Sequence, residues 1–217
     1  MGEADRPPSP PLNLVGDYGG GAMLLVVGVL AALVEARTTG QGRVVDAAMT
    51  DGAALLGGLF QALRGQGMWS DRRGANLLDG GAPFYRCYAC RDGGFVAVAA
   101  LEPRFYSALL AGLEIDPAEA VQYDLAAWPA LQARFSALFA SRDRDGWSAH
   151  FAGTEACVTP VLSLAEAPDH PHNQARKTFQ DGLPRPAPLF DGTAAEPGSK
   201  SALTLDQMVT KWSHRAG

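Results

Sequence analysis

An aspartate followed closely by three glycines is the stretch of this sequence best suited to chemistry. Asp17 precedes Gly19, Gly20 and Gly21, and an uncharged apolar run over 22–34 comes directly behind them. A carboxylate at a helix start can accept hydrogen bonds from the first free N–H groups and faces the positive end of the helix dipole. Glycines let a ligand approach backbone N–H groups closely. The pattern indicates a ligand-accessible carboxylate, and a plain helix cap with a tight turn is the alternative.

Two other clusters have residue types that could bind metal or carry redox chemistry. Cys87 and Cys90 form a C-x-x-C, and Asp169, His170 and His172 lie within four residues of one another. A zinc or redox site needs a second ligand pair or a helix start after the cysteines, and this pair falls in a strand-like run. No second cluster supports the histidines, which suit a helix cap. We therefore expect packing thiols and no metal site.

The elements that must position Asp17 form the first part of the chain. A helix over 22–36 is apolar all round, so it is expected to be buried, and its apolar run is too short to span a bilayer. Arg37 in the last turn and Gly40 just beyond are typical of a helix end. A short strand over 44–49 and a helix over 50–63 would complete part of an α/β layer.

The second part of the chain has the pattern of a small α+β domain. A Gly-, Asp- and Arg-rich stretch over 64–79 is typical of a linker, and Arg91–Asp92–Gly93 indicates a hairpin turn between two strands. Helical periodicity and a first-turn proline at Pro103 predict the helices that follow. The expected elements are strands over 85–90, 94–101 and 158–164, helices over 103–113, 128–141, 143–152 and 172–179, a coil over 183–198 and a terminal helix over 204–212.

These blocks, in this order, resemble the family III CoA-transferase superfamily of the CaiB/BaiF type. Within it they look most like the C-terminal part of the alpha-methylacyl-CoA racemases. The resemblance implies an α/β fold, with an incomplete Rossmann-like large domain and a small α+β domain that has an antiparallel sheet. The matching blocks are 16–56, 68–69, 71–76, 78–85 and 156–161.

The resemblance also implies domain boundaries. Residues 1–63 would be the C-terminal portion of the large domain and 64–79 a linker. Residues 80–182 would form the small domain, and 183–217 a return coil with a terminal helix.

The roles of individual residues are likewise implied by the resemblance. Asp17 matches a catalytic aspartate that serves one face of the substrate Cα, and Glu102 matches the acidic partner of the base on the opposite face. The amides that follow Asp17 would stabilise an enolate. Substrate-binding residues implied by the match are Asn13, Tyr85, Gly19, Gly20 and Gly21. No metal and no cofactor are expected, since CoA is part of the substrate.

One catalytic group of the family has no counterpart here. The opposite base is a histidine upstream of the matched region, whereas His150, His170, His172 and His214 all lie downstream. The expectation is a 2-methylacyl-CoA racemase truncated at its N-terminus, or one half of a split pair. Two alternatives stay open: a CoA-transferase with Asp17 as nucleophile, and an inactive partner subunit.

The amino-acid composition limits the classes of partner that the protein is expected to bind. A net charge of −5 argues against non-specific nucleic-acid binding, and 47% hydrophobic residues allow a sizeable core. The N-terminal residues are polar and proline-rich, without the apolar core of a signal peptide. We expect a cytoplasmic protein with no membrane span, an acyl-CoA thioester as ligand and an interlocked homodimer as the intact assembly.

Overall fold

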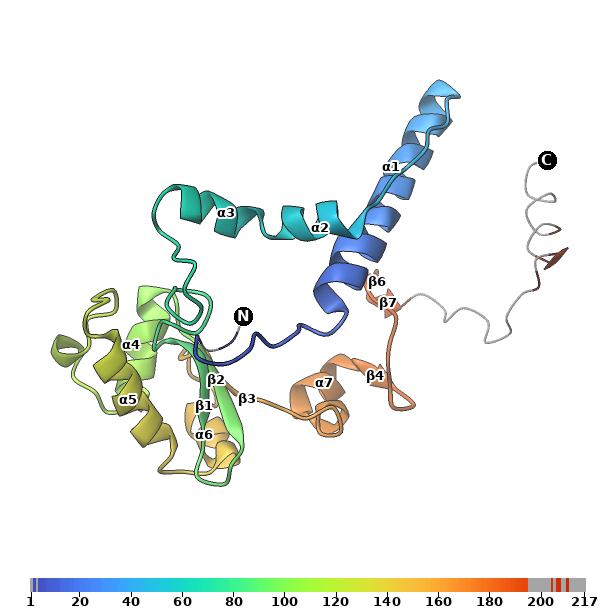
Figure 1. The fold of residues 1–217 in the computed structure, drawn as a ribbon. Coiled ribbons are helices and arrows are strands. Elements are labelled where there is room, and N and C mark those ends of the chain that lie inside the picture. Colours follow the sequence, from blue (N-terminus) through green and yellow to red (C-terminus); the bar gives the residue numbers. More distant parts are fainter. Residues whose placement is uncertain (1, 3, 195–203, 205, 208–209, 211–217) are drawn as a thin grey trace. The chain divides into compact units, whose positions relative to one another are not determined.

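The computed structural model describes residues 2, 4–194, 204, 206–207 and 210 (Figure 1). The chain divides into two compact units, Met1–Val161 and Leu162–Gly217. It contains both helices and antiparallel sheets, which confirms the mixed fold class. The boundaries at 63, 79 and 182 stay predictions.

A long continuous helix dominates the beginning of the chain. A π-helical stretch, η1 (Leu14–Met23), runs directly into α1 (Leu24–Thr39). The helix ends as predicted, because Gly40 adopts a left-handed φ of 73° and its N–H donates to the Ala36 carbonyl. An extended segment then returns along α1 to α2 (Met49–Leu56) and α3 (Gly58–Gly65), as Figure 1 shows.

Two expectations for this region were wrong. No residue of α1 is buried, and Val34 is 67% exposed. Residues 44–48 are extended without pairing to any described strand. The physical reason is the same for both. An apolar helix is buried only when other elements cover it, and a strand forms only beside a partner with free backbone groups.

The continuity of η1 and α1 also changes the membrane argument. The apolar run over 22–34 was expected to be too short for a bilayer. The combined helix Leu14–Thr39 has 26 residues, and an 18-residue stretch of it has a mean hydropathy of 2.0, so by length and composition alone it could cross one. A core helix of an α/β domain passes the same test.

The small domain is built on a three-stranded antiparallel sheet, as predicted. Its strands β1 (Tyr85–Ala89), β2 (Phe95–Ala99) and β3 (Val158–Pro160) have the order β1-β2-β3. Gly93 turns the hairpin with a φ of 80°. The predicted helices are α4 (Pro103–Gly112), α5 (Trp128–Phe139) and α6 (Arg144–Phe151), with a short 3-10 turn, η2 (Pro117–Glu119).

Aromatic side chains form the core between this sheet and its helices. Phe84 and Phe139 are fully buried, and the ring of Tyr88 stacks on Phe139 with centroids 5.0 Å apart. The Tyr88 hydroxyl donates to the Pro83 carbonyl at 2.6 Å, so its polar atom is satisfied. This core fixes the backbone on both sides of Tyr85.

The second unit contains short elements. They are η3 (Ala167–Asp169), α7 (Pro171–Arg176), and the two-stranded pairs β4 (Phe179–Gln180) with β5 (Leu183–Pro184) and β6 (Leu189–Phe190) with β7 (Thr193–Ala194). The expected coil over 183–198 therefore holds strands in its described part. Most of the predicted terminal helix over 204–212 lies outside the described residues.

Candidate functional site

Asp17 lies inside η1 and not at a helix start, which corrects the sequence prediction. The helix begins at Leu14, and the Tyr18 N–H already donates to the Asn13 carbonyl at 3.1 Å, the i−5 bond of a π-helix. The amides that follow therefore belong to the body of the helix. Asp17 is exposed, and its carboxylate has no hydrogen-bond or ion-pair partner among the described residues. A solvated carboxylate of this kind can accept a proton or attack a carbonyl.

The glycines after Asp17 pack against α2. An added Cβ at Gly20 would lie 2.8 Å from the Ala53 backbone nitrogen, and one at Gly21 would lie 3.2 Å from the Met49 side chain. Gly20 is the one buried residue of η1. The structure thus gives these glycines a packing function, whereas their contact with substrate stays a prediction.

Tyr85 opens β1 and is half-buried. Its backbone pairs with Ala99 of β2, and its N–H donates to the Ala82 carbonyl at 3.1 Å. The preceding Phe84 packs edge-on against Tyr106 with ring centroids 5.3 Å apart. These contacts hold Tyr85 on the wall of a cavity of about 1040 Å³.

Glu102 precedes α4 with an extended backbone and an exposed side chain that makes no capping bond. Its backbone carbonyl accepts the Tyr106 N–H at 3.0 Å. Burial first, and then the negative charge of Glu102, raise the pKa of the Cys157 thiol. Cys157 therefore lies near Glu102, and its thiol stays protonated at neutral pH. The main-chain carbonyl of Cys157 accepts the Ala99 N–H at 3.0 Å.

The expected site residues fall into two groups. Tyr85 and Glu102 lie at the same end of the β1–β2 ladder, because Tyr85 pairs with Ala99 three positions before Glu102. Asn13 immediately precedes η1, and Asp17 lies within it. None of the hydrogen bonds or ion pairs of the described residues joins one group to the other.

No cluster of the described residues has three side chains that could hold a metal ion. The imidazole of His150 makes structural contacts, since its Nε2 lies 2.8 Å from the Gly112 carbonyl and its ring packs edge-on against Trp147. This histidine is therefore not placed to act as the missing base.

Sequence reasoning missed a polar network in the loop before Tyr85. Asn76, which is 6% exposed, accepts the Ser70 N–H at 2.7 Å. The Asp79 carboxylate accepts the N–H groups of Gly74 at 3.0 Å, Asn76 at 2.8 Å and Gly81 at 3.2 Å. An Asn three residues before an Asp in a Gly-rich stretch is the signal that could have indicated it, because such side chains bond their own loop. The network fixes the chain that leads into β1.

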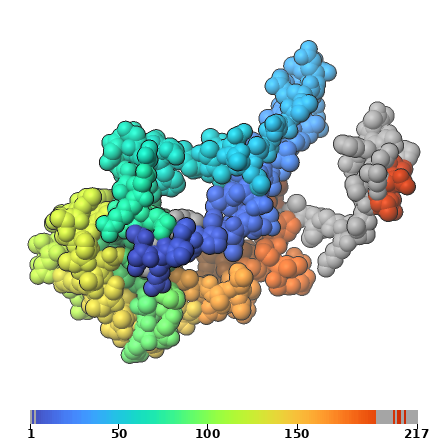
Figure 2. Space-filling model, in the orientation of Figure 1, coloured from blue at the N-terminus to red at the C-terminus, as the bar shows by residue number. Residues whose placement is uncertain are grey.

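Figure 2 shows the dark-blue N-terminal residues lying against the segment that follows α3. Arg73 makes this connection, since its Nη2 donates to the Ala4 carbonyl at 3.5 Å and to that of Arg6.

The comparisons with known proteins identify relatives from one protein family. The model of "CoA-transferase family III" matches residues 1–193. The sequence is 43% identical to mouse and 41% identical to human alpha-methylacyl-CoA racemase, over 92% of this chain and 54% of each relative. The chain therefore spans about half the length of the curated relatives it matches. A CaiB/BaiF family protein from Brucella suis has the same fold, with a TM-score of 0.69 at 21% identity over 98% of this chain and 58% of that structure.

Proposed function

This chain belongs to CoA-transferase family III, and we propose that it functions in racemising a 2-methylacyl-CoA thioester. The observation that carries the proposal is the 43% identity to the mouse racemase over nearly the whole of this chain. The exposed carboxylate of Asp17 supports it, because that group has no hydrogen-bond or ion-pair partner among the described residues to release before it meets a ligand.

Racemisation needs a proton to leave one face of Cα and another to arrive on the opposite face. The thioester carbonyl makes the α-proton acidic by accepting charge as an enolate. In our proposal the Asp17 carboxylate takes the proton on its face of Cα. Asn13 and Tyr85 bind the substrate beside that carboxylate and the thioester. Positioned acid–base groups of this kind typically contribute about 10²–10⁴-fold to the rate.

The opposite face requires a second group, and we propose that it comes from the part of the relatives that this chain does not span. Glu102 would orient that group, since its exposed carboxylate makes no capping bond. The exposed apolar side chains of α1 support an interlocked homodimer, because a helix face of this kind requires a covering surface. The cytoplasm stays the proposed compartment.

A CoA-transferase is the second candidate, favoured by the family to which the chain belongs. In that reaction the Asp17 carboxylate would attack the thioester carbonyl, form a mixed anhydride and release CoA as a thiolate. The thiolate would then attack the Asp17 carbonyl carbon and release the free acid, leaving CoA bound to Asp17 as a thioester. A racemase forms no such adduct.

The experiment compares the chain alone with the chain joined to the portion of the mouse racemase that it does not span. We expect the fusion to invert an (R)-2-methylacyl-CoA and the chain alone to be essentially inactive. Hydroxylamine trapping with mass spectrometry tests for an adduct on Asp17 in both proteins. An adduct without inversion would support the transferase, and inactivity of the folded, CoA-binding fusion in both assays would support an inactive subunit.

A further inference from the structure

The cavity beside Tyr85 has features of a ligand site, and the proposed reaction assigns a role to Tyr85 alone among the residues of its wall. Its walls come from the β1–β2 hairpin, from α5 and from the loop that follows α3, and its volume is about 1040 Å³. Sites for small molecules typically measure roughly 300–1,000 Å³. Ala97, Val98 and Pro129 supply apolar wall, so the cavity suits a ligand with both an apolar and an ionic part.

The ionic groups around this cavity are mainly cationic. Three arginines, Arg72, Arg73 and Arg86, line it together with two acids, Asp5 and Asp79. The Asp79 carboxylate is already bonded to the amides of its own loop, at 2.8 Å to Asn76 and 3.0 Å to Gly74. These bonds occupy the Asp79 oxygens, and the cavity still has one more cationic than anionic side chain, which favours an anion.

Arg86 gives the strongest single indication that the cavity binds an anion. Its side chain is half-buried, and no carboxylate of the described residues lies within ion-pair distance of it, whereas Arg91 and Arg134 each bond one at 2.9 Å. Its Nη1 donates to the Gly80 carbonyl at 3.3 Å, and its Cζ lies 5.4 Å from the Tyr88 ring centroid. Its Nε is buried and has no hydrogen-bond partner in the part of the chain that the structure describes. Removing a cation from water without a counter-charge is costly, so a binding anion would be favoured here.

We propose that this cavity binds a phosphate group carried by a small molecule, with Arg86 as its main contact and Arg72 as a second contact at the rim. Guanidinium groups bind phosphate through paired N–H donors, and a doubly charged phosphate can accept from more than one of them. The cavity shares Tyr85 with the substrate-binding residues proposed above, whereas neither Asp17 nor Glu102 lines it, so phosphate binding can be measured separately from the racemase reaction.

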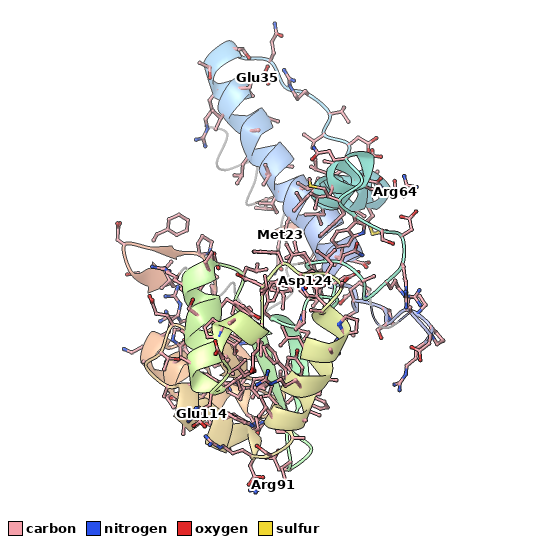
Figure 3. The ribbon with its side chains drawn as sticks, turned by 90° about the vertical axis from the view of Figure 1, so that its left-hand side faces the viewer. Met23, Glu35, Arg64, Arg91, Glu114 and Asp124 are labelled. Carbon is pink, nitrogen blue, oxygen red and sulfur yellow. The ribbon has the colours of Figure 1, made fainter. Side chains whose placement is uncertain are left out.

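Equilibrium dialysis of the 217-residue chain against radiolabelled pyrophosphate, at constant ionic strength, tests the proposal. We expect saturable binding at one site per chain. Arg86→Gln should weaken it by about 10- to 100-fold, since a hydrogen bond to a charged group is typically worth about 1.5–3 kcal/mol. Arg72→Gln should weaken it less. Arg91→Gln is the matched control, because Arg91 lies at the hairpin tip, as Figure 3 shows, and does not line the cavity.

Competition identifies the source of the phosphate. Tighter binding of CoA than of pyrophosphate would assign the group to a CoA-type ligand, and equal binding would assign it to a free polyphosphate; both results support the site. Succinate that competes as well as pyrophosphate would overturn phosphate recognition. The absence of saturable binding, or equal affinity in the wild-type, Arg72→Gln and Arg91→Gln proteins, would overturn the site itself. Arg72 is exposed, so its variant keeps the test valid if Arg86→Gln fails to fold.

Discussion

Gly20 and Gly52 bring the backbones of η1 and α2 into direct contact. A Cβ at Gly52 would overlap the Gly20 carbonyl group, and a Cβ at Gly20 would lie 2.8 Å from the Ala53 backbone nitrogen. The crossing sets the position of the helix that carries Asp17, so a change at either glycine is transmitted to the proposed catalytic carboxylate.

Gly52→Ala should lower the free energy of unfolding by about 1–3 kcal/mol, because the methyl group over-packs a backbone contact that cannot give way. Gly58→Ala in α3 is the control, since nothing lies within 4 Å of its added Cβ. Urea unfolding followed by circular dichroism measures both variants. Equal stability of the two would show that the η1–α2 crossing is not as close as described.

The loop before Tyr85 should depend on the Asp79 carboxylate. Asp79→Asn replaces an acceptor of three backbone N–H groups with a side chain that is also a donor, and we expect a loss of about 1–3 kcal/mol in the free energy of unfolding. Asp71→Asn is the control, because Asp71 bonds Arg64 at 3.0 Å on an exposed surface. A neutral effect of Asp79→Asn would contradict the structural importance of the network.

Two buried tyrosines should couple stability to alkaline pH. Burial raises the pKa of Tyr106 to about 12, and burial also raises that of Tyr88. An unfolded tyrosine ionises near pH ~10, so the folded state holds these phenol protons more tightly. The resulting stability is complete below pH ~10 and is lost as the pH rises toward 12.

Ultraviolet titration of tyrosinate tests the direction of this pH dependence. Two of the five tyrosines should ionise late and together with unfolding, and Tyr106→Phe should remove one of the late ionisations. Ionisation of all five in one step near pH ~10, with the fold intact, would refute the prediction.

The exposed face of α1 should cause self-association. Val27, Leu30 and Val34 lie on one side of the helix at helical spacing and are 59%, 57% and 67% exposed. Sedimentation velocity should show oligomers of the purified chain, and replacing all three with Lys should shift it toward monomer. A wild-type chain that is monomeric at micromolar concentration would be inconsistent with this expectation.

The small domain could be predicted from sequence because its stabilising contacts are local to the chain. Strand-forming runs on either side of Gly93 predict the β1–β2 hairpin, and the chain itself supplies Phe135 and Phe139 to cover the sheet. Local patterns were sufficient where the core residues and their covering helices occur in one continuous stretch.

The first part of the chain was harder to predict for a physical reason. The apolar pattern of α1 indicated burial, but burial depends on surfaces that the described residues do not supply. The helix start was missed because η1 begins at Leu14 with no capping bond from Asn13, so no local signal marks it. The Gly20–Gly52 contact joins positions 32 residues apart (52 − 20), which spacing rules do not address.

Exchange of the α-proton of a 2-methylacyl-CoA for deuterium in D₂O tests the role of Asp17 most directly. The assay uses the protein completed with the mouse portion, and it compares Asp17→Asn with Asp51→Asn, an exposed aspartate of α2. We predict that Asp17→Asn slows exchange by about 10²–10⁴-fold, whereas Asp51→Asn leaves it unchanged. Exchange at the wild-type rate in a folded Asp17→Asn protein would contradict the proposed function of Asp17.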